Sequence, residues 1–205
     1  MRTNKIHALL LAGGLIAWSG LVDPRLPARW QPVLRALVGT GLVAITRHPT
    51  GLRPTVVRPG LRWGAVAAVL VTAGTAATTA VPAVRVAMRQ RELPANPAGW
   101  LMLRIPVGTV WSEETAYRAA LASVGARAFG ARGGRLLQAA AFGLSHIADA
   151  RATGVPVVGT VLVTGGAGWV FGWLADRSGG LAAPMLAHLA VNEAGALAVL
   201  FFHRR

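Results

Sequence analysis

Long apolar runs, separated by short charged segments, constrain most strongly what this chain can fold into. Of its 205 residues, 54% are hydrophobic and only 14% are charged. A helix needs about 20 mostly apolar residues to cross the hydrocarbon core of a bilayer. We therefore predict an all-α fold, a polytopic transmembrane helical bundle of about seven helices, with six to eight as the range.

The apolar runs divide the chain into expected spans. These spans cover residues 6–22, 31–46, 61–81, 99–124, 135–148, 156–175 and 181–202. The second and fifth are short for a full crossing, so we expect their flanks or the surrounding bundle to compensate. The N-terminal run also fits a signal peptide, but because further apolar runs follow, we expect a retained first span.

Arginines supply most of the charge, and they lie between the apolar runs. The segments 47–62 and 85–92 are examples, and we predict them to be loops. A net charge of +14 would suggest nucleic acid in a soluble protein. Here the arginines flank apolar runs, where they would contact anionic lipid headgroups. We therefore expect the lipid bilayer as a partner and no nucleic acid.

Ionisable residues also occur inside three of the apolar stretches. The stretches are WSEETAYRAAL (111–121), AAAFGLSHIADA (139–150) and PMLAHLAVNEAGALAVL (184–200). An ionisable side chain at the centre of a membrane helix costs about 2.5 to 3.5 kcal/mol on insertion scales, so such residues usually line a bundle interior or a wet cavity. These three stretches are the candidates for chemistry.

Helix geometry separates the two adjacent glutamates of the first stretch. Neighbouring residues lie about 100° apart around a helix, so Glu113 and Glu114 face different directions. Glu114 and Arg118 stand four apart, an arrangement that favours an ion pair on one face. Glu113 has no cation nearby in the sequence, and it suits a carboxylate that takes and returns a proton.

The other two stretches supply imidazole and amide groups. His188 and Asn192 share a helix face, and an amide beside an imidazole can stabilise a developing oxyanion. His146 lies on another stretch, one turn after Phe142. Together with Glu113 these groups would form a polar chamber able to hold a water. The alternative is that the histidines and the amide are interhelical hydrogen-bonding groups and Glu113 only lines a cavity.

These stretches resemble the three signature motifs of the CPBP family of intramembrane proteases, which includes the CAAX prenyl endopeptidase Rce1. The family pattern EExxxR is matched by Glu113, Glu114 and Arg118, FxxxH by Phe142 and His146, and HxxxN by His188 and Asn192. All three motifs occur in the family's order. The resemblance divides the chain into N-terminal transmembrane helices, residues 1–98, and a CPBP-like protease core, residues 99–205.

The resemblance implies an intramembrane endopeptidase that hydrolyses a peptide bond of a membrane-tethered or hydrophobic peptide. The implied catalytic residues are Glu113, His146, His188 and Asn192, with Glu114, Arg118 and Phe142 as structural support. In this scheme Glu113 activates a water that His146 helps to hold. His188 and Asn192 stabilise the oxyanion.

The alternative is that a metal ion at this site takes part in the hydrolysis. Glu113, His146 and His188 are the residues that would bind zinc, as in a metallo-endopeptidase. The compact HExxH helix, which brings metal ligands and base together, is absent from the sequence. We therefore expect a glutamate-dependent enzyme with no metal and no cofactor, and keep zinc as the alternative.

Two other classes of function use similar residues. A non-catalytic membrane protein that binds a peptide, such as a bacteriocin-immunity protein, would not need Glu113 as a base. A proton-coupled transporter would use a buried carboxylate, but we find no inverted repeat in the sequence. The composition, rich in Ala, Gly and Arg with one lysine, resembles proteins from GC-rich bacterial genomes. The expected location is therefore the bacterial cytoplasmic membrane.

Overall fold

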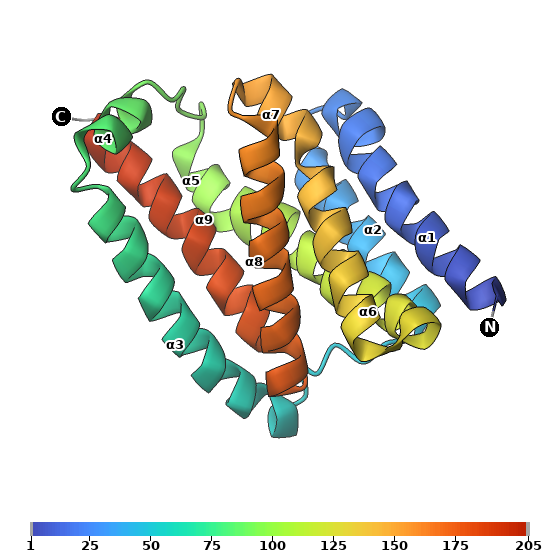
Figure 1. Ribbon diagram of the computed structural model, residues 1–205. Coiled ribbons are helices and arrows are strands. Elements are labelled where there is room, and N and C mark those ends of the chain that lie inside the picture. Colours follow the sequence, from blue (N-terminus) through green and yellow to red (C-terminus); the bar gives the residue numbers. More distant parts are fainter. Residues whose placement is uncertain (1, 204–205) are drawn as a thin grey trace.

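The computed structural model describes residues 2–203, and within this range all regular structure is helical (Figure 1). The predicted all-α bundle is therefore confirmed. Three terminal residues lie outside the described residues: Met1 of the predicted N-terminal part (1–98), and Arg204 and Arg205 of the predicted protease core (99–205). Helix α1 (Arg2–Ala17) continues through η1 (Trp18–Val22) into η2 (Asp23–Arg25). The other long helices are α2 (Gln31–Thr46), α3 (Pro54–Thr78), α8 (Val157–Ser178) and α9 (Ala182–His203).

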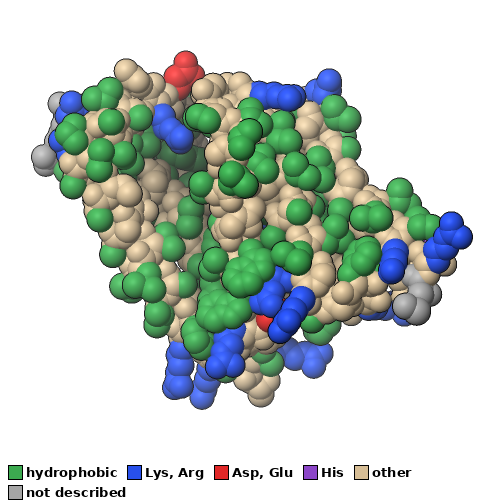
Figure 2. All heavy atoms as spheres, viewed as in Figure 1, with side chains coloured by type: hydrophobic (Ala, Val, Ile, Leu, Met, Phe, Trp, Pro, Cys, Tyr) green, Lys and Arg blue, Asp and Glu red, His purple; other side chains and the backbone are tan. Residues whose placement is uncertain are grey.

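The outer surface of the bundle is apolar. Leu10, Val69 and Leu162 expose 67%, 67% and 70% of their surface. Figure 2 shows hydrophobic side chains over the middle of one face, with lysines and arginines gathered towards its ends. Four helical segments are long and apolar enough to cross a membrane, namely Arg2–Arg25, α3, α8 and α9. The chain is therefore an integral membrane protein.

A long central helix carries the first motif. It runs from α5 (Pro97–Gly99) through η3 (Trp100–Trp111) and η4 (Glu114–Leu121) into α6 (Ala122–Ser145). Segments η3 and η4 wind as π-helices, which are rare and often occur at functional sites. Pro106 lies inside η3 and has no backbone N–H to donate. The expected span 99–124 is thus part of a longer helix.

Gly130 divides α6 into two helical parts. Its φ of 77° lies in the region that glycine adopts without steric cost, and the chain turns there. The part after Gly130 corresponds to the expected span 135–148, but it ends at Ser145. His146 then adopts a non-helical conformation at the junction with α7 (Ile147–Thr153).

The predicted loops were partly wrong. Residues 85–92 include most of α4 (Pro82–Arg89), which lies with α7 at one end of the bundle (Figure 1). The segment 47–62 contains the start of α3, which begins at Pro54. Proline is well suited to the first turn of a helix, since its missing N–H would have no partner there anyway. Helix α2, by contrast, begins and ends as predicted.

The packing holds the motif helices together. Helix α3 lies along α9, α1 lies along α6, and α2 packs against η3 and η4. One hydrophobic core cluster joins α1, η4 and α6, and its buried members are Ala12, Leu15, Ala116, Tyr117, Leu121, Ala141 and Phe142. The N-terminal helices therefore contact the segment that contains the motifs directly.

Gly39 lets α2 approach the central helix closely. A Cβ at this position would lie 2.7 Å from the carbonyl oxygen of Ser112 and would also collide with Oγ1 of Thr115. We expect Gly39→Ala to lower the free energy of unfolding in detergent by about 1 to 3 kcal/mol, as overpacking does. On the same helix, Gly41→Ala is the matched control, since its Cβ would meet nothing within 4 Å. Equal stability of the two variants would contradict this packing.

Candidate active site

Glu114 and Arg118 form a fully buried ion pair. Nε of Arg118 lies 3.4 Å from Oε2 of Glu114, and both side chains are 0% exposed. The other carboxylate oxygen, Oε1, lies 2.8 Å from Nδ1 of His188 and accepts its hydrogen bond. Glu114 therefore joins the first motif to the third.

Aromatic rings cover the buried Arg118. Its guanidinium carbon lies 4.0 Å from the ring centre of Phe142 and 5.2 Å from that of Phe171. Cation–π contacts of this kind stabilise a cation that has lost its water. Phe142, the first residue of the second motif, thus forms part of the wall around the ion pair.

His188 lies between the two glutamates. While Nδ1 contacts Glu114, Nε2 lies 3.7 Å from Oε2 of Glu113. The ring also stacks on Phe171, with centroids 5.0 Å apart. Glu113 differs from its neighbour in exposure, since its side chain is 26% exposed whereas that of Glu114 is 0% exposed. The two acids therefore face different surroundings.

The hydrogen bond of His146 defines its tautomer. Nδ1 lies 2.7 Å from the carbonyl oxygen of Phe142. Because a carbonyl oxygen can only accept, Nδ1 must carry the proton. In the neutral ring, Nε2 is then a hydrogen-bond acceptor. The ring packs edge-on against Phe142, with centroids 4.7 Å apart.

Asn192 is the fourth predicted catalytic residue. Its Nδ2 donates a hydrogen bond of 3.1 Å to the carbonyl oxygen of His188, one turn earlier on α9. An amide nitrogen carries two protons, so a second donor remains for another acceptor.

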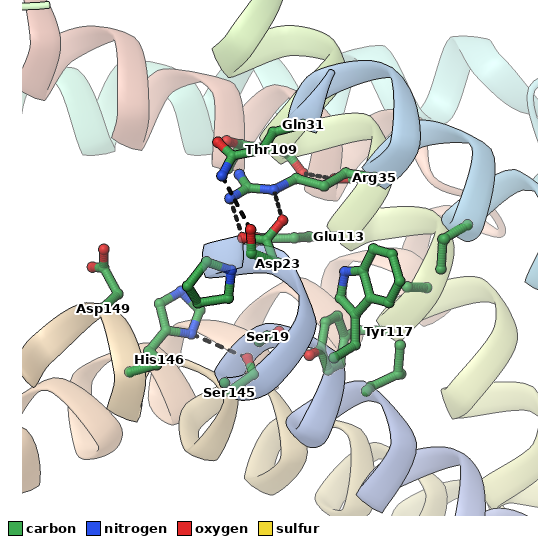
Figure 3. A pocket seen from close by; sticks show the side chains of 18 of the residues that line it. Ser19, Asp23, Gln31, Arg35, Thr109, Glu113, Tyr117, Ser145, His146 and Asp149 are labelled. Carbon is green, nitrogen blue, oxygen red and sulfur yellow. Dashed lines mark hydrogen bonds and ion pairs between the residues drawn. The ribbon is translucent and has the colours of Figure 1, made fainter. Parts of the chain in front are cut away.

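A cavity of about 800 Å³, which we call the catalytic cavity, brings most of these groups together. Glu113, His146 and Asn192 all line it, and Figure 3 shows the first two on facing sides. His188 does not line the cavity itself, but its Nε2 lies 3.7 Å from Oε2 of Glu113, which does. The hydroxyl of Tyr117 also faces the cavity, near Ser19 and Ser145 (Figure 3).

Residues 95–194 match a family described as "Type II CAAX prenyl endopeptidase Rce1-like". Over this segment, slightly less than half of the chain, the sequence is similar to the Rce1-like family. The matched segment contains all three motifs, and this similarity supports the general class of intramembrane CAAX-type endopeptidase. Neither the search of curated proteins nor the search of solved structures gave a match.

The sequence analysis did not predict that the N-terminal helices line part of the catalytic cavity, beside the motif residues. Ser19 comes from η1 (Trp18–Val22), Asp23 from η2 (Asp23–Arg25) and Arg35 from α2. Arg35 is an ionisable residue inside the predicted span 31–46, and such residues usually line a bundle interior or a cavity. This feature of the sequence could have indicated that α2 contributes to the cavity.

Asp23 and Arg35 form an ion pair at the edge of the catalytic cavity (Figure 3). Nε of Arg35 donates to Oδ1 of Asp23 at 2.6 Å, and Nη2 contacts Oδ2. Such a two-pronged pair holds its partners in a defined geometry. It fixes η2 to α2 beside the Rce1-like motifs.

The three residues named as alternative zinc ligands, Glu113, His146 and His188, are not grouped as a metal site in the part of the chain that the structure describes. Within residues 2–203, no group of three or more His, Asp or Glu side chains is arranged to hold a metal ion. Nδ1 of His146 is bonded to a carbonyl oxygen, and Nδ1 of His188 is bonded to Glu114. These bonds fix the orientation of both rings through Nδ1 alone, so a metal-free site stays a prediction for experiment to test.

Proposed function

We propose that this Rce1-like protein hydrolyses a peptide bond of a hydrophobic or membrane-tethered peptide, using a water that Glu113 activates. The observation that carries the proposal is the environment of Glu113. Its carboxylate lines the catalytic cavity together with His146 and Asn192, and it lies 3.7 Å from the buried His188.

The water would bind between Glu113 and His146. Nε2 of the neutral His146 ring accepts one hydrogen bond from this water, and the carboxylate of Glu113 accepts the other. Glu113 then removes a proton while the water oxygen attacks the carbonyl carbon of the peptide. Positioned acid–base groups of this kind typically contribute about 10² to 10⁴ to the rate.

Asn192 and His188 would stabilise the tetrahedral intermediate. The oxyanion accepts a hydrogen bond from the second proton of Asn192 Nδ2, and another from Nε2 of His188 when that ring is protonated on both nitrogens. Glu114 supports this role because it accepts the bond from Nδ1 of His188. Glu113 then passes its proton to the peptide nitrogen as the C–N bond breaks, which leaves a new carboxylate and a new amine.

The apolar exterior supports a substrate that arrives from the membrane. Helices that line the catalytic cavity also expose large hydrophobic side chains to their surroundings, as α1 and α9 show. A peptide with a CAAX-type C-terminus, the substrate in the family's description, is one candidate. We place the reaction in a bacterial cytoplasmic membrane, as the composition indicates.

Catalysis in this scheme needs no metal. We expect wild-type protein in membranes to release the same peptide products with and without the chelator 1,10-phenanthroline, measured by mass spectrometry of membrane-associated peptides. The non-chelating isomer 1,7-phenanthroline is the matched control. Loss of products with the chelator alone, and their return on adding zinc, would instead establish a metalloprotease.

A further inference from the structure

Tryptophans and arginines adjoin at one end of the bundle, where the start of α3 lies beside the end of α8 (Figure 1). One tryptophan comes from α3, one arginine from the part of α6 after Gly130, and the rest from α8. We call this set the Trp–Arg patch, and its members are Trp63, Arg135, Trp169, Trp173 and Arg177. Figure 2 shows hydrophobic and basic side chains together at this end. None of the five residues lines the catalytic cavity.

The three indoles of the patch form one exposed row. Trp63 and Trp173 meet edge to face, with ring centres 5.6 Å apart, and Trp169 lies one turn before Trp173 on α8. Each ring exposes between 36% and 43% of its surface. None of the three N–H groups donates a hydrogen bond within residues 2–203. Exposed indoles near the ends of membrane-spanning helices are typical of the interface between membrane and water.

Arg135 is held in a cradle on α8. Its guanidinium carbon lies 5.0 Å from the ring centre of Trp169. A Cβ on Gly172 would lie 3.2 Å from Cγ of Arg135, so the glycine makes room for the arginine stem. Nη1 lies 3.5 Å from Oδ2 of Asp176, which is longer than a good charge-assisted hydrogen bond. Nε has no hydrogen-bond partner within residues 2–203. The guanidinium is therefore fixed in place while its donors stay largely unused.

Arg177 carries the second unused guanidinium. Its guanidinium carbon lies 5.6 Å from the ring centre of Trp63, and it makes no ion pair within residues 2–203. Helix α8 has 22 residues. At about 1.5 Å per residue it spans about 33 Å, close to the thickness of the hydrocarbon core. Because Arg177 is the residue before the last of this helix, it lies at the level of the lipid headgroups.

We propose that the Trp–Arg patch binds an anionic phospholipid. Arg135 donates hydrogen bonds to the lipid phosphate, which a planar guanidinium matches well, and Arg177 adds a second positive charge at the headgroup level. The indoles pack against the glycerol and the upper acyl chains. Two cations face one carboxylate, that of Asp176, so the charge favours an anionic lipid over a zwitterionic one. Lipid binding at this patch does not require the proposed hydrolysis.

Native mass spectrometry of the full-length chain in detergent tests the proposal. The protein is titrated with phosphatidylglycerol and, separately, with phosphatidylcholine of the same acyl chains, and the dissociation constant of the first bound lipid is measured. Phosphatidylglycerol should bind more tightly. One basic residue beside anionic lipid contributes about fivefold in affinity, so Arg135→Gln combined with Arg177→Gln should weaken phosphatidylglycerol binding roughly 30-fold.

The matched control is Arg29→Gln combined with Arg89→Gln, which removes the same charge from two exposed positions. Arg29 also lies over an indole, that of Trp30, but outside the patch. This control should bind phosphatidylglycerol almost as tightly as wild type. Equal weakening in both double variants would show that only net charge matters, and would overturn the inference.

Two further results would also overturn lipid binding at the patch. One is equal affinity of the wild-type protein for the two lipids. The other is retention of inorganic phosphate in place of lipid, which would assign the patch to a free anion. If the double variant does not fold, Arg177→Gln alone, at an exposed position, should weaken phosphatidylglycerol binding about fivefold. An unchanged affinity in this single variant would contradict the proposal.

Discussion

Glu113→Gln should reduce peptide cleavage by at least about 100-fold, and by up to about 10⁴-fold. Glutamine has nearly the same shape as glutamate, so it can still line the catalytic cavity, but it cannot take a proton from water. Binding of the peptide should be retained because the amide keeps one acceptor oxygen. Quantitative mass spectrometry of membrane-associated peptides, with wild type and variant at equal levels, measures the effect.

The matched control for this substitution is Glu193→Gln. Glu193 follows Asn192 on α9, but it does not line the catalytic cavity, so its loss should leave cleavage unchanged. If Glu113→Gln retains the wild-type peptide profile, Glu113 is not the base. A protein that only binds a peptide would then be the better explanation.

Arg118→Leu should lower the free energy of unfolding by about 3 to 5 kcal/mol, because it leaves a buried carboxylate without its cation. Glu114 is 0% exposed, so no water can replace the lost guanidinium without rearrangement of the bundle. Leucine keeps apolar contact with Phe142, so that the effect reports mainly the lost charge. Thermal or denaturant unfolding in detergent micelles measures it.

A second substitution separates charge from packing. Adding Glu114→Gln to Arg118→Leu removes the unpaired charge, while the amide oxygen can still accept the bond from His188. The double variant should therefore be more stable than Arg118→Leu alone. Arg58→Leu, on the exposed surface of α3, should cost little and is the control. A double variant no more stable than Arg118→Leu would show that charge burial is not the cause.

Local periodicity accounts for what could be predicted from the sequence. The pairing of Glu114 with Arg118 depends only on a four-residue spacing along a helix, and the structure places the two side chains 3.4 Å apart. The different directions of Glu113 and Glu114 follow from the same geometry, and the structure gives their side chains exposed fractions of 26% and 0%. The bounds of α2 follow from the length of one apolar run.

Contacts between distant segments could not be read in this way. Glu114 binds a histidine that lies 74 residues later, and no spacing rule connects the two. The ion pair of Asp23 and Arg35 depends on how η2 folds back beside α2. The π-helical winding of η3 and η4 was not predicted either. The contribution of the N-terminal helices to the catalytic cavity was missed because it depends on such contacts between distant segments.

The most direct test of the central claim follows the oxygen of the attacking water. Membranes containing wild-type protein are incubated in water enriched in heavy oxygen, and the released peptides are analysed by mass spectrometry beside membranes containing Glu113→Gln. Activation of water by Glu113 predicts one heavy oxygen atom in the new carboxylate of the N-terminal fragment of each cleaved peptide, and at least about 100-fold less of this labelled fragment from the variant. Products that form without heavy oxygen, or labelled products at equal yield from the variant, would contradict the account.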